Sequence, residues 1–238
     1  MIEIRELSKA FGRLKVLDGL DLTIKTGETM VIIGRSGSGK SVLLKHVIGL
    51  LVPDAGSVRI DGVDVTTLSA EALNALRMKF GMLFQNAALF DSMTAFENVA
   101  FPLLEHTTMT SEEIRKRVHD CLQLVGLEHA DALYPAQLSG GMRKRVGLAR
   151  ALAMGPKIIL YDEPTTGIDP IMGDIVNDLT IALRDRLKVT SVVVTHDMRS
   201  AYKVADRIAM LYNGKIIEVG SPEAIRQSRN PVVQQFIK

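Results

Sequence analysis

The feature that most constrains the fold of this chain is the segment 34–41, GRSGSGKS, which lies between a β-prone run and a helical pattern. It fits G-x-x-x-x-G-K-[ST] at every fixed position. Glycines let the backbone wrap closely around a phosphate and turn its N–H groups toward the oxygens. The helix that follows adds the positive end of its dipole. A strand, a phosphate loop and a helix in series predict a nucleotide-binding core, whereas an ordinary glycine-rich turn would need neither flanking element.

All eight loop residues are candidates for nucleotide binding. Lys40 is expected to reach the β- and γ-phosphates as a point charge and to act in catalysis, and Ser41 to ligate Mg²⁺. The other loop residues surround the phosphates, and they are Gly34, Arg35, Ser36, Gly37, Ser38 and Gly39.

A second candidate site follows the apolar run 158–161, where Asp162 and Glu163 stand side by side. Carboxylates at the carboxyl end of a buried strand meet ligands at the edge of an α/β sheet. Asp162 is expected to hold Mg²⁺, and Glu163 to act as a general base that polarises the attacking water. Two acids solvated at a strand end are the alternative. The phosphate loop upstream favours the catalytic interpretation.

The apolar pattern divides the chain into a sheet-forming part and a helical part. Alternating residues in 2–7 and 20–24 indicate strands, and continuous apolar runs at 29–33, 158–161, 192–194 and 208–211 are typical of a parallel sheet covered on both faces. Helices are predicted over 41–51, from Ser111 as N-cap, and from Ser139 to Met154. The single cysteine, Cys121, falls on an apolar helical stripe and is expected to be core.

Composition limits the classes of protein to which the chain can belong. The hydrophobic content is 47% and the net charge is +2, which fits a globular domain and gives no bias toward nucleic acid. The basic clusters 115–117 and 143–145 are interpreted as solvated helix faces. No apolar run reaches the about 18 residues that span a bilayer, and neither a secretory signal nor an internal disulfide is indicated. A membrane role would therefore be peripheral and in a reducing compartment.

Residues 138–142, LSGGM, resemble the signature motif of ABC ATPases, and they lie between the phosphate loop and the Asp162 strand, as in that family. Met142 departs from the usual glutamine. The resemblance implies that Ser139, Gly140 and Gly141 bind the phosphates of a nucleotide held by a second copy of the chain. A hydroxyl and free N–H groups at a helix start suit that role.

Four further positions match family motifs in order. Gln85 resembles the Q-loop glutamine that senses Mg²⁺, with an ordinary surface amide as the alternative. Asp169, in the segment 165–170, resembles the D-loop aspartate at the dimer interface. His196 resembles the switch histidine at the γ-phosphate, and Phe11 the aromatic residue that stacks on adenine. A structural histidine and a core aromatic residue are the alternatives for these two.

The family likeness implies an α/β fold: a P-loop NTPase of the ABC ATPase type, with a parallel sheet flanked by helices, an N-terminal antiparallel β subdomain and a helical insert. We predict one domain over 1–238, with its nucleotide-binding core in 1–87 and 155–225, the helical subdomain in 88–154 and a tail in 226–238. The tail is expected either to fray or to dock on the partner. The cofactors implied are ATP and Mg²⁺, and the functional unit is a homodimer.

Segments 84–103, 138–142 and 230–237 resemble the Mla-type group, whose members drive phospholipid trafficking between inner and outer membranes and maintain outer-membrane lipid asymmetry. The partners implied are a MlaE-like membrane permease dimer, a MlaD-like MCE protein and a MlaB-like STAS-domain regulator, with no nucleic acid. The location implied is the cytoplasmic side of the bacterial inner membrane. The alternatives are an ABC transporter for amino acids, metals or another solute, and a soluble ABC ATPase that acts on nucleic acid or ribosomes.

Overall fold

A six-stranded sheet in the order β10-β9-β3-β8-β7-β6 lies at the centre of the computed structural model, which describes residues 1–238. Strands β6, β7, β8, β3 and β9 run parallel, and β10 pairs antiparallel at one edge. The predicted parallel sheet is therefore confirmed. The strands are β3 (Thr29–Ile33), β6 (Phe80–Leu83), β7 (Ile158–Asp162), β8 (Thr190–Thr195), β9 (Arg207–Tyr212) and β10 (Lys215–Gly220).

Each face of this sheet carries its own hydrophobic core, which explains the continuous apolar runs. Along β3, Val31 and Ile33 belong to a cluster of 31 buried residues, whereas Met30 and Ile32 belong to a second cluster of 23. Successive side chains of a strand point to opposite faces, so a strand covered on both sides needs apolar residues at every position.

One face is covered by α1 (Lys40–Val47) and by an antiparallel sheet ordered β2-β1-β4-β5. Its strands are β1 (Ile2–Phe11), β2 (Leu14–Ile24), β4 (Ala55–Ile60) and β5 (Val63–Asp64). Ile4 pairs with Leu22 on one side and with Val58 on the other, and all three side chains are buried. The predicted N-terminal β subdomain is confirmed.

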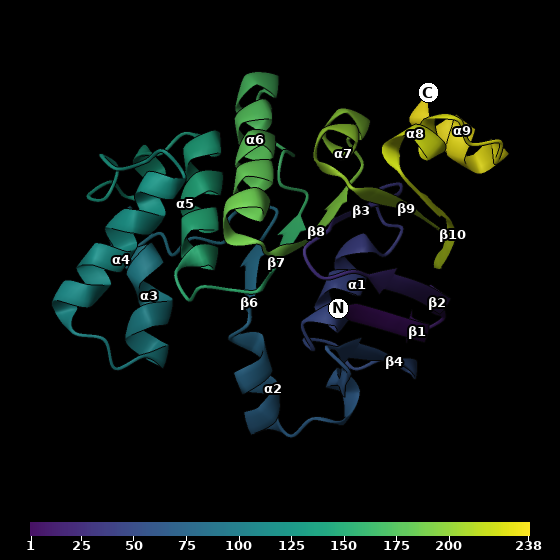
Figure 1. Ribbon diagram of the computed structural model, residues 1–238, viewed down its shortest axis with the longest axis horizontal. Coiled ribbons are helices and arrows are strands. Elements are labelled where there is room, and N and C mark those ends of the chain that lie inside the picture. The colour runs from purple at the N-terminus through teal and green to yellow at the C-terminus, as the bar shows by residue number, and fades with distance from the viewer.

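The opposite face packs against α6 (Pro170–Leu187) and α7 (Met198–Val204). The core on this face continues into the helical part of the chain, made of α3 (Ala95–His106), α4 (Ser111–Leu124) and α5 (Gly140–Leu152). Figure 1 shows these three helices together on one side of the molecule, away from β1, β2 and β4. Cys121 is fully buried among them, as predicted.

Some helix boundaries differ from the prediction. Helix α5 ends at Leu152 and not at Met154. The N-cap of α4 is Thr110 and not Ser111, because the Thr110 hydroxyl and the Glu113 carboxylate close a reciprocal capping box. Helix α1 ends at Val47 and not at Leu51, and Gly49 follows with a φ of 69°. That left-handed conformation terminates a helix and favours glycine. The remaining short helices are α2 (Ala70–Arg77), η1 (Val65–Thr67) and η2 (Pro135–Gln137).

The end of the chain forms two short helices, α8 (Pro222–Arg226) and α9 (Pro231–Ile237), which lie beside β9 and β10 in Figure 1. Ile225 and Val233 are fully buried in the larger core cluster. The segment is therefore packed on its own chain and not frayed. Docking on a partner stays a prediction.

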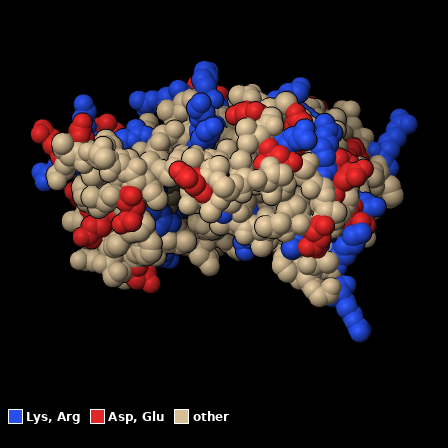
Figure 2. Space-filling model, turned by 90° about the horizontal axis from the view of Figure 1, so that it is seen from below, with Lys and Arg blue, Asp and Glu red and all other residues tan.

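None of the helices combines the length and the hydrophobicity that a membrane crossing requires. Figure 2 shows the underside of the molecule, where acidic and basic side chains are interspersed and uncharged surface lies between them.

Candidate functional site

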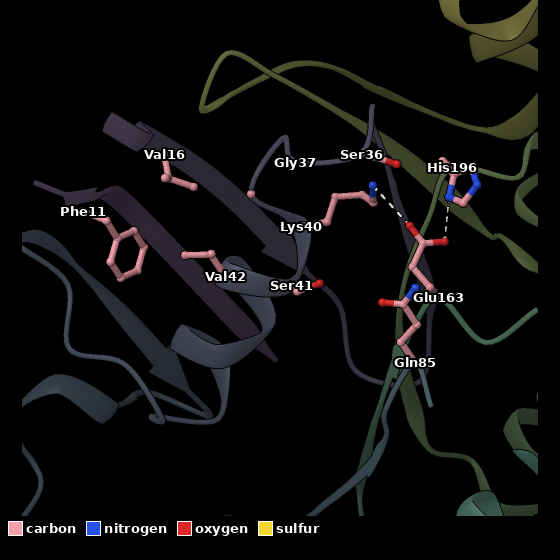
Figure 3. A pocket seen from close by; sticks show the side chains of 11 residues that line it. Phe11, Val16, Ser36, Gly37, Lys40, Ser41, Val42, Gln85, Glu163 and His196 are labelled. Carbon is pink, nitrogen blue, oxygen red and sulfur yellow. Dashed lines mark hydrogen bonds and ion pairs between the residues drawn. The ribbon is translucent and has the colours of Figure 1, made fainter. Parts of the chain in front are cut away.

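A cavity of about 370 Å³ opens between the phosphate loop, the first two strands and the carboxyl ends of the parallel strands. Figure 3 shows the side chains that converge on it. Most of the predicted site residues line this cavity together with two valines, and the full lining is Phe11, Val16, Ser36, Gly37, Gly39, Lys40, Ser41, Val42, Gln85, Glu163 and His196.

The path of the phosphate loop requires glycine at position 39. Gly39 has a φ of 101° and caps α1, so Lys40 is the first helical residue. A Cβ built on Gly39 would lie 2.9 Å from the Val16 side chain and 3.2 Å from Leu17. The loop is thus pressed against β2, and the first turn of α1 faces the cavity with Lys40 and Ser41.

Lys40 is held at the back of the loop by oxygen atoms. Its Nζ donates to the carbonyls of Gly34 at 2.8 Å and Arg35 at 3.2 Å, and it pairs with Glu163 Oε1 at 3.2 Å. Only 6% of the lysine side chain and 9% of the glutamate side chain are exposed. This buried pair puts the cation where phosphate oxygens would bind, and a phosphate would take the place of the carboxylate as its partner.

Ser41 at the start of α1 and Asp162 at the end of β7 bring two oxygen atoms together. The Ser41 hydroxyl donates to Asp162 Oδ1 at 2.8 Å, and the Gln85 side chain lines the same cavity. Burial raises the pKa of Asp162, although the hydrogen bond from Ser41 opposes this. Hydroxyl, carboxylate and amide oxygens are hard donors that suit Mg²⁺, which also keeps waters and binds substrate phosphates. The residues therefore fit the predicted metal.

Glu163 has an unusual backbone and three partners for its side chain. Its φ is 49°, in the left-handed region, and its amide donates to the Val194 carbonyl at 2.9 Å. Besides Lys40, the carboxylate accepts from His196 Nδ1 at 2.9 Å and from the Thr166 hydroxyl at 3.0 Å. Burial would raise the pKa of Glu163, but the His196 hydrogen bond and the Lys40 charge outweigh burial and lower it. The group is an ionised carboxylate at neutral pH, as a general base must be.

His196 lies directly after β8 (Thr190–Thr195), where the strand ends at the cavity. Figure 3 shows its ring pointing at the Glu163 carboxylate from the side opposite Gln85. The side chain is 47% exposed, so it is reachable from solvent while it holds Glu163. The role of His196 at the γ-phosphate, and the alternative of a structural histidine, stay predictions.

Phe11 lies at the far end of the cavity, with Val16 and Val42 beside it (Figure 3). Its ring is 47% exposed, which does not fit the alternative of a core aromatic residue. The cavity therefore has an apolar end and a charged end, as a nucleotide with a flat base and a phosphate tail would need.

Several predicted residues lie outside this cavity. Ser139 is exposed and caps α5, where its hydroxyl accepts from Met142 N at 3.2 Å. Gly140 lines a separate cavity of about 240 Å³, and Asp169 lines another of about 230 Å³ and caps α6. Within one chain, neither the signature residues 139–141 nor Asp169 line the cavity that contains Lys40. Their binding of a partner's nucleotide remains a prediction.

The lysine at position 144 contradicts the prediction of a solvated helix face. Only 4% of Lys144 is exposed, and its Nζ donates to the carbonyls of Gln85 and of Glu163, the latter at 3.1 Å. Burial lowers the pKa of Lys144, and the nearby charges of Asp162 and Glu163 oppose this. Gly141, Lys144 and Leu148 are spaced so that they lie on one face of a helix, and all three are buried. This spacing could have predicted that Lys144 is buried, but the arginines on either side favoured a solvated face.

Thr166 was also not singled out as a ligand of Glu163, because its role depends on the sharp turn after β7. That turn places the threonine hydroxyl over the carboxylate three residues earlier.

An apolar groove of about 450 Å³ lies on the helical side of the molecule. Phe90 and Phe101 contact each other there with ring centroids 4.9 Å apart, and Phe84 and Phe90 remain 37% and 43% exposed. In the segment 86–103, predicted as a mixture of insert core and interaction surface, Phe96 and Leu89 pack on the core and Phe90 is exposed. Binding of a partner by the exposed residues stays a prediction.

Comparison with known proteins places the chain among transporter ATPases. Residues 17–166 match the family described as ABC transporter. The probable ribonucleotide transport ATP-binding protein mkl of Mycobacterium leprae is 44% identical over 99% of this chain and 68% of its own length. The chain spans about two thirds of the length of the mycobacterial relatives that it matches.

Two other relatives are similar to the same degree. The intermembrane phospholipid transport system ATP-binding protein MlaF of Haemophilus influenzae is 42% identical over 100% of this chain and 90% of its own length. The methionine import ATP-binding protein MetN of Carboxydothermus hydrogenoformans is 43% identical over 94% of this chain and 67% of its own length.

A solved structure has the same fold. The dimeric ATP-binding cassette MJ0796, in a post-hydrolysis state bound to ADP and Pi, superposes with a TM-score of 0.86 at 37% identity. The match covers 93% of this chain and 99% of that one.

Proposed function

Since this chain belongs to the ABC transporter family and is the ATPase subunit of such a transporter, we propose that its transporter moves phospholipids between the inner and outer membranes of a bacterial envelope. The proposal includes maintenance of outer-membrane lipid asymmetry. The observation that carries it is the match to MlaF, which extends over the whole chain and 90% of MlaF at 42% identity.

The cavity supports a definite division of labour in ATP hydrolysis. Lys40 exchanges Glu163 for the β- and γ-phosphate oxygens when ATP binds, and Phe11 stacks on the adenine. Ser41, Asp162 and Gln85 are the residues that would hold Mg²⁺, which neutralises charge on the phosphates when it is bound. Glu163, released from Lys40, orients the water and accepts its proton as the water oxygen attacks phosphorus.

His196 and Thr166 position the carboxylate during this step. Each donates to Glu163 Oε2, so the other oxygen is left free once Lys40 has moved to the phosphates. The products are ADP and phosphate. The second phosphate-binding element, Ser139 to Gly141, serves the nucleotide of the partner subunit, as two copies arranged head to tail would allow.

One proposed partner is supported by a surface that the nucleotide site leaves unused. The apolar groove around Phe84, Phe90 and Phe101 is the surface for a helix of a MlaE-like permease. A MlaD-like MCE protein and a MlaB-like regulator complete the assembly, in which this chain lies at the cytoplasmic side of the inner membrane. The MlaD-like and MlaB-like partners rest on the likeness to MlaF.

Affinity purification of the Glu163→Gln variant from native membranes in ATP tests the substrate, with mass spectrometry of proteins and lipids as the readout. We expect an MCE protein, a permease and bound phospholipid. The matched control is Lys40→Met, which loses the phosphate-binding cation and should not trap the complex.

The methionine and ribonucleotide relatives define a second candidate, an ABC importer of a small polar solute. A solute-binding protein with a different permease in the same purification would favour it and would refute the phospholipid proposal. Ribosomes or nucleic acid would instead refute the transporter assignment.

A further inference from the structure

Lys144 is a buried cation placed between three parts of the chain. It lies on α5 (Gly140–Leu152) and donates to the Gln85 carbonyl, which follows β6, and at 3.1 Å to the Glu163 carbonyl, which follows β7. With 4% of the residue exposed, water does not solvate the ammonium, so it is stabilised by these carbonyls and by the nearby charges of Asp162 and Glu163.

The two carbonyls belong to neighbouring strands whose ends need such a link. Strands β6 and β7 pair from Phe80 to Leu83, and Gln85 lies beyond the last paired residue. Glu163 holds a φ of 49°, which is disfavoured for any residue except glycine. A donor on its carbonyl fixes the peptide that follows it, and with it the direction of the carboxylate.

The same helix begins at the signature motif. Ser139 is the N-cap of α5, and Lys144 lies five residues later, roughly 7.5 Å along the axis at 1.5 Å per residue. A helix of this length is rigid. If Ser139 moves when it binds a phosphate, the movement is transmitted along α5 to Lys144 and from there to the backbone of Glu163.

We propose that Lys144 is a positioning residue that ties the backbone of the catalytic Glu163 in one ATP site to the helix whose N-terminus binds the nucleotide of the other site. The inference rests on the proposed function, because it needs a dimer with two shared sites. Its consequence is cooperativity: nucleotide bound at Ser139 aligns the general base of the same chain, which acts at the other site.

The adjacent arginines do not make this connection. Arg143 donates to the Leu138 carbonyl at 2.6 Å, and Arg145 to the carbonyls of Val125 at 3.2 Å and Gly126 at 3.1 Å. Both tie α5 to the helical part alone. Arg145 is therefore a matched control for Lys144: a partly buried cation on the same helix that also donates to two backbone carbonyls.

The test compares Lys144→Met, Lys144→Gln and Lys144→Arg with Arg145→Met in the full-length protein. The measurements are ATP turnover with its Hill coefficient, the affinity for the fluorescent analogue mant-ATP, and the melting temperature. Lys144→Met removes every donor at nearly constant length, Gln keeps two donors, and Arg keeps the donors and the charge.

We expect a Hill coefficient of about 2 for the wild type, since two sites are coupled. Lys144→Met should lower kcat by about 10–100-fold, the cost of misplacing a catalytic group by about 1 Å, and bring the Hill coefficient to about 1. The mant-ATP affinity should stay within about threefold, because no phosphate-binding group is lost. Lys144→Arg should recover most of kcat and of the cooperativity, and Lys144→Gln should fall between. Arg145→Met should lower only the melting temperature.

A wild-type Hill coefficient of one overturns the inference, as does Lys144→Met with wild-type kcat and cooperativity. If Lys144→Arg has a kcat no higher than that of Lys144→Met, and both variants lose affinity for mant-ATP, the role of Lys144 is structural. That result would also overturn the inference. If Lys144→Met does not fold, Lys144→Gln carries the same comparison. A wild-type chain that hydrolyses no ATP refutes the proposed function and this inference together, whereas active wild type with an unchanged Lys144→Met refutes the inference alone.

Discussion

Replacing Glu163 with glutamine exchanges one carboxylate oxygen for an amide group and keeps the shape of the side chain. His196 and Thr166 can still donate to the remaining oxygen, so the local structure should persist. Lys40 loses the carboxylate that it contacts at 3.2 Å and stays free for phosphate. The variant therefore removes the proton acceptor and leaves the binding groups in place.

General-base assistance contributes a factor of about 10²–10⁴ in rate, which corresponds to about 3–5 kcal/mol of the activation barrier. We expect kcat to fall by that factor. ATP affinity should be equal or higher, because a negative charge beside the phosphates disappears. With binding intact and turnover nearly stopped, ATP should hold the protein as a closed dimer.

Phosphate release, mant-ATP titration and size-exclusion chromatography in ATP check these three statements. Glu28→Gln is the matched control, because Glu28 is a buried glutamate that pairs with Arg207 and lies outside the cavity. It should keep the wild-type kcat. Turnover of Glu163→Gln within threefold of the wild type would refute the general-base assignment.

Four further outcomes test other parts of the molecule. Ser139→Arg should abolish turnover at the partner's site, so mixed dimers with one variant chain will show whether the loss falls in trans; a loss confined to the variant's own phosphate loop would contradict the shared site. Phe11→Ala should weaken mant-ATP binding by about tenfold, since stacking on a base contributes about 1–3 kcal/mol, whereas Leu14→Ala, at an exposed position outside the cavity, should not. The pKa of Glu163 in the fold is below its ordinary value of 4.5. The charge of Glu163 therefore stabilises the fold above pH 4.5, and this stabilisation is lost as the pH falls through the lowered pKa. The difference in melting temperature between the wild type and Glu163→Gln should shrink from pH 7 to pH 4, and a constant difference would contradict the assigned ion pair. Val233→Ala should cost about 1–3 kcal/mol in urea unfolding, because the side chain is fully buried; an unchanged free energy of unfolding would show that α9 is not part of the core.

The residues that we propose to bind nucleotide could be predicted from the sequence because the chemistry that they suit is local. Successive backbone groups of the loop 34–41 would surround a phosphate, and the acids after β7 occupy the end of a recognisable buried strand. The buried strands of the parallel sheet could also be predicted from the sequence. Strand β3, for example, lies between two cores and needs apolar residues on both faces.

Boundaries that depend on a single side-chain contact were less predictable. Thr110 and Ser111 are both good caps, and the choice between them was made by Glu113, which reaches back to Thr110. The apolar residues of the last segment indicated neither α9 nor its burial, because Val233 is covered by elements from distant parts of the chain.

Short stretches of sequence are enough to identify the candidates for phosphate binding, because such candidates act through successive backbone groups. How these candidates are connected depends on contacts between distant parts of the fold. Lys144 has an arginine on either side, and helical spacing alone places it on the face of Gly141 and Leu148 without showing what its ammonium contacts. It is buried because the ends of β6 and β7 bring two carbonyls against one face of α5, and an ammonium excluded from water is stable only where such oxygens converge.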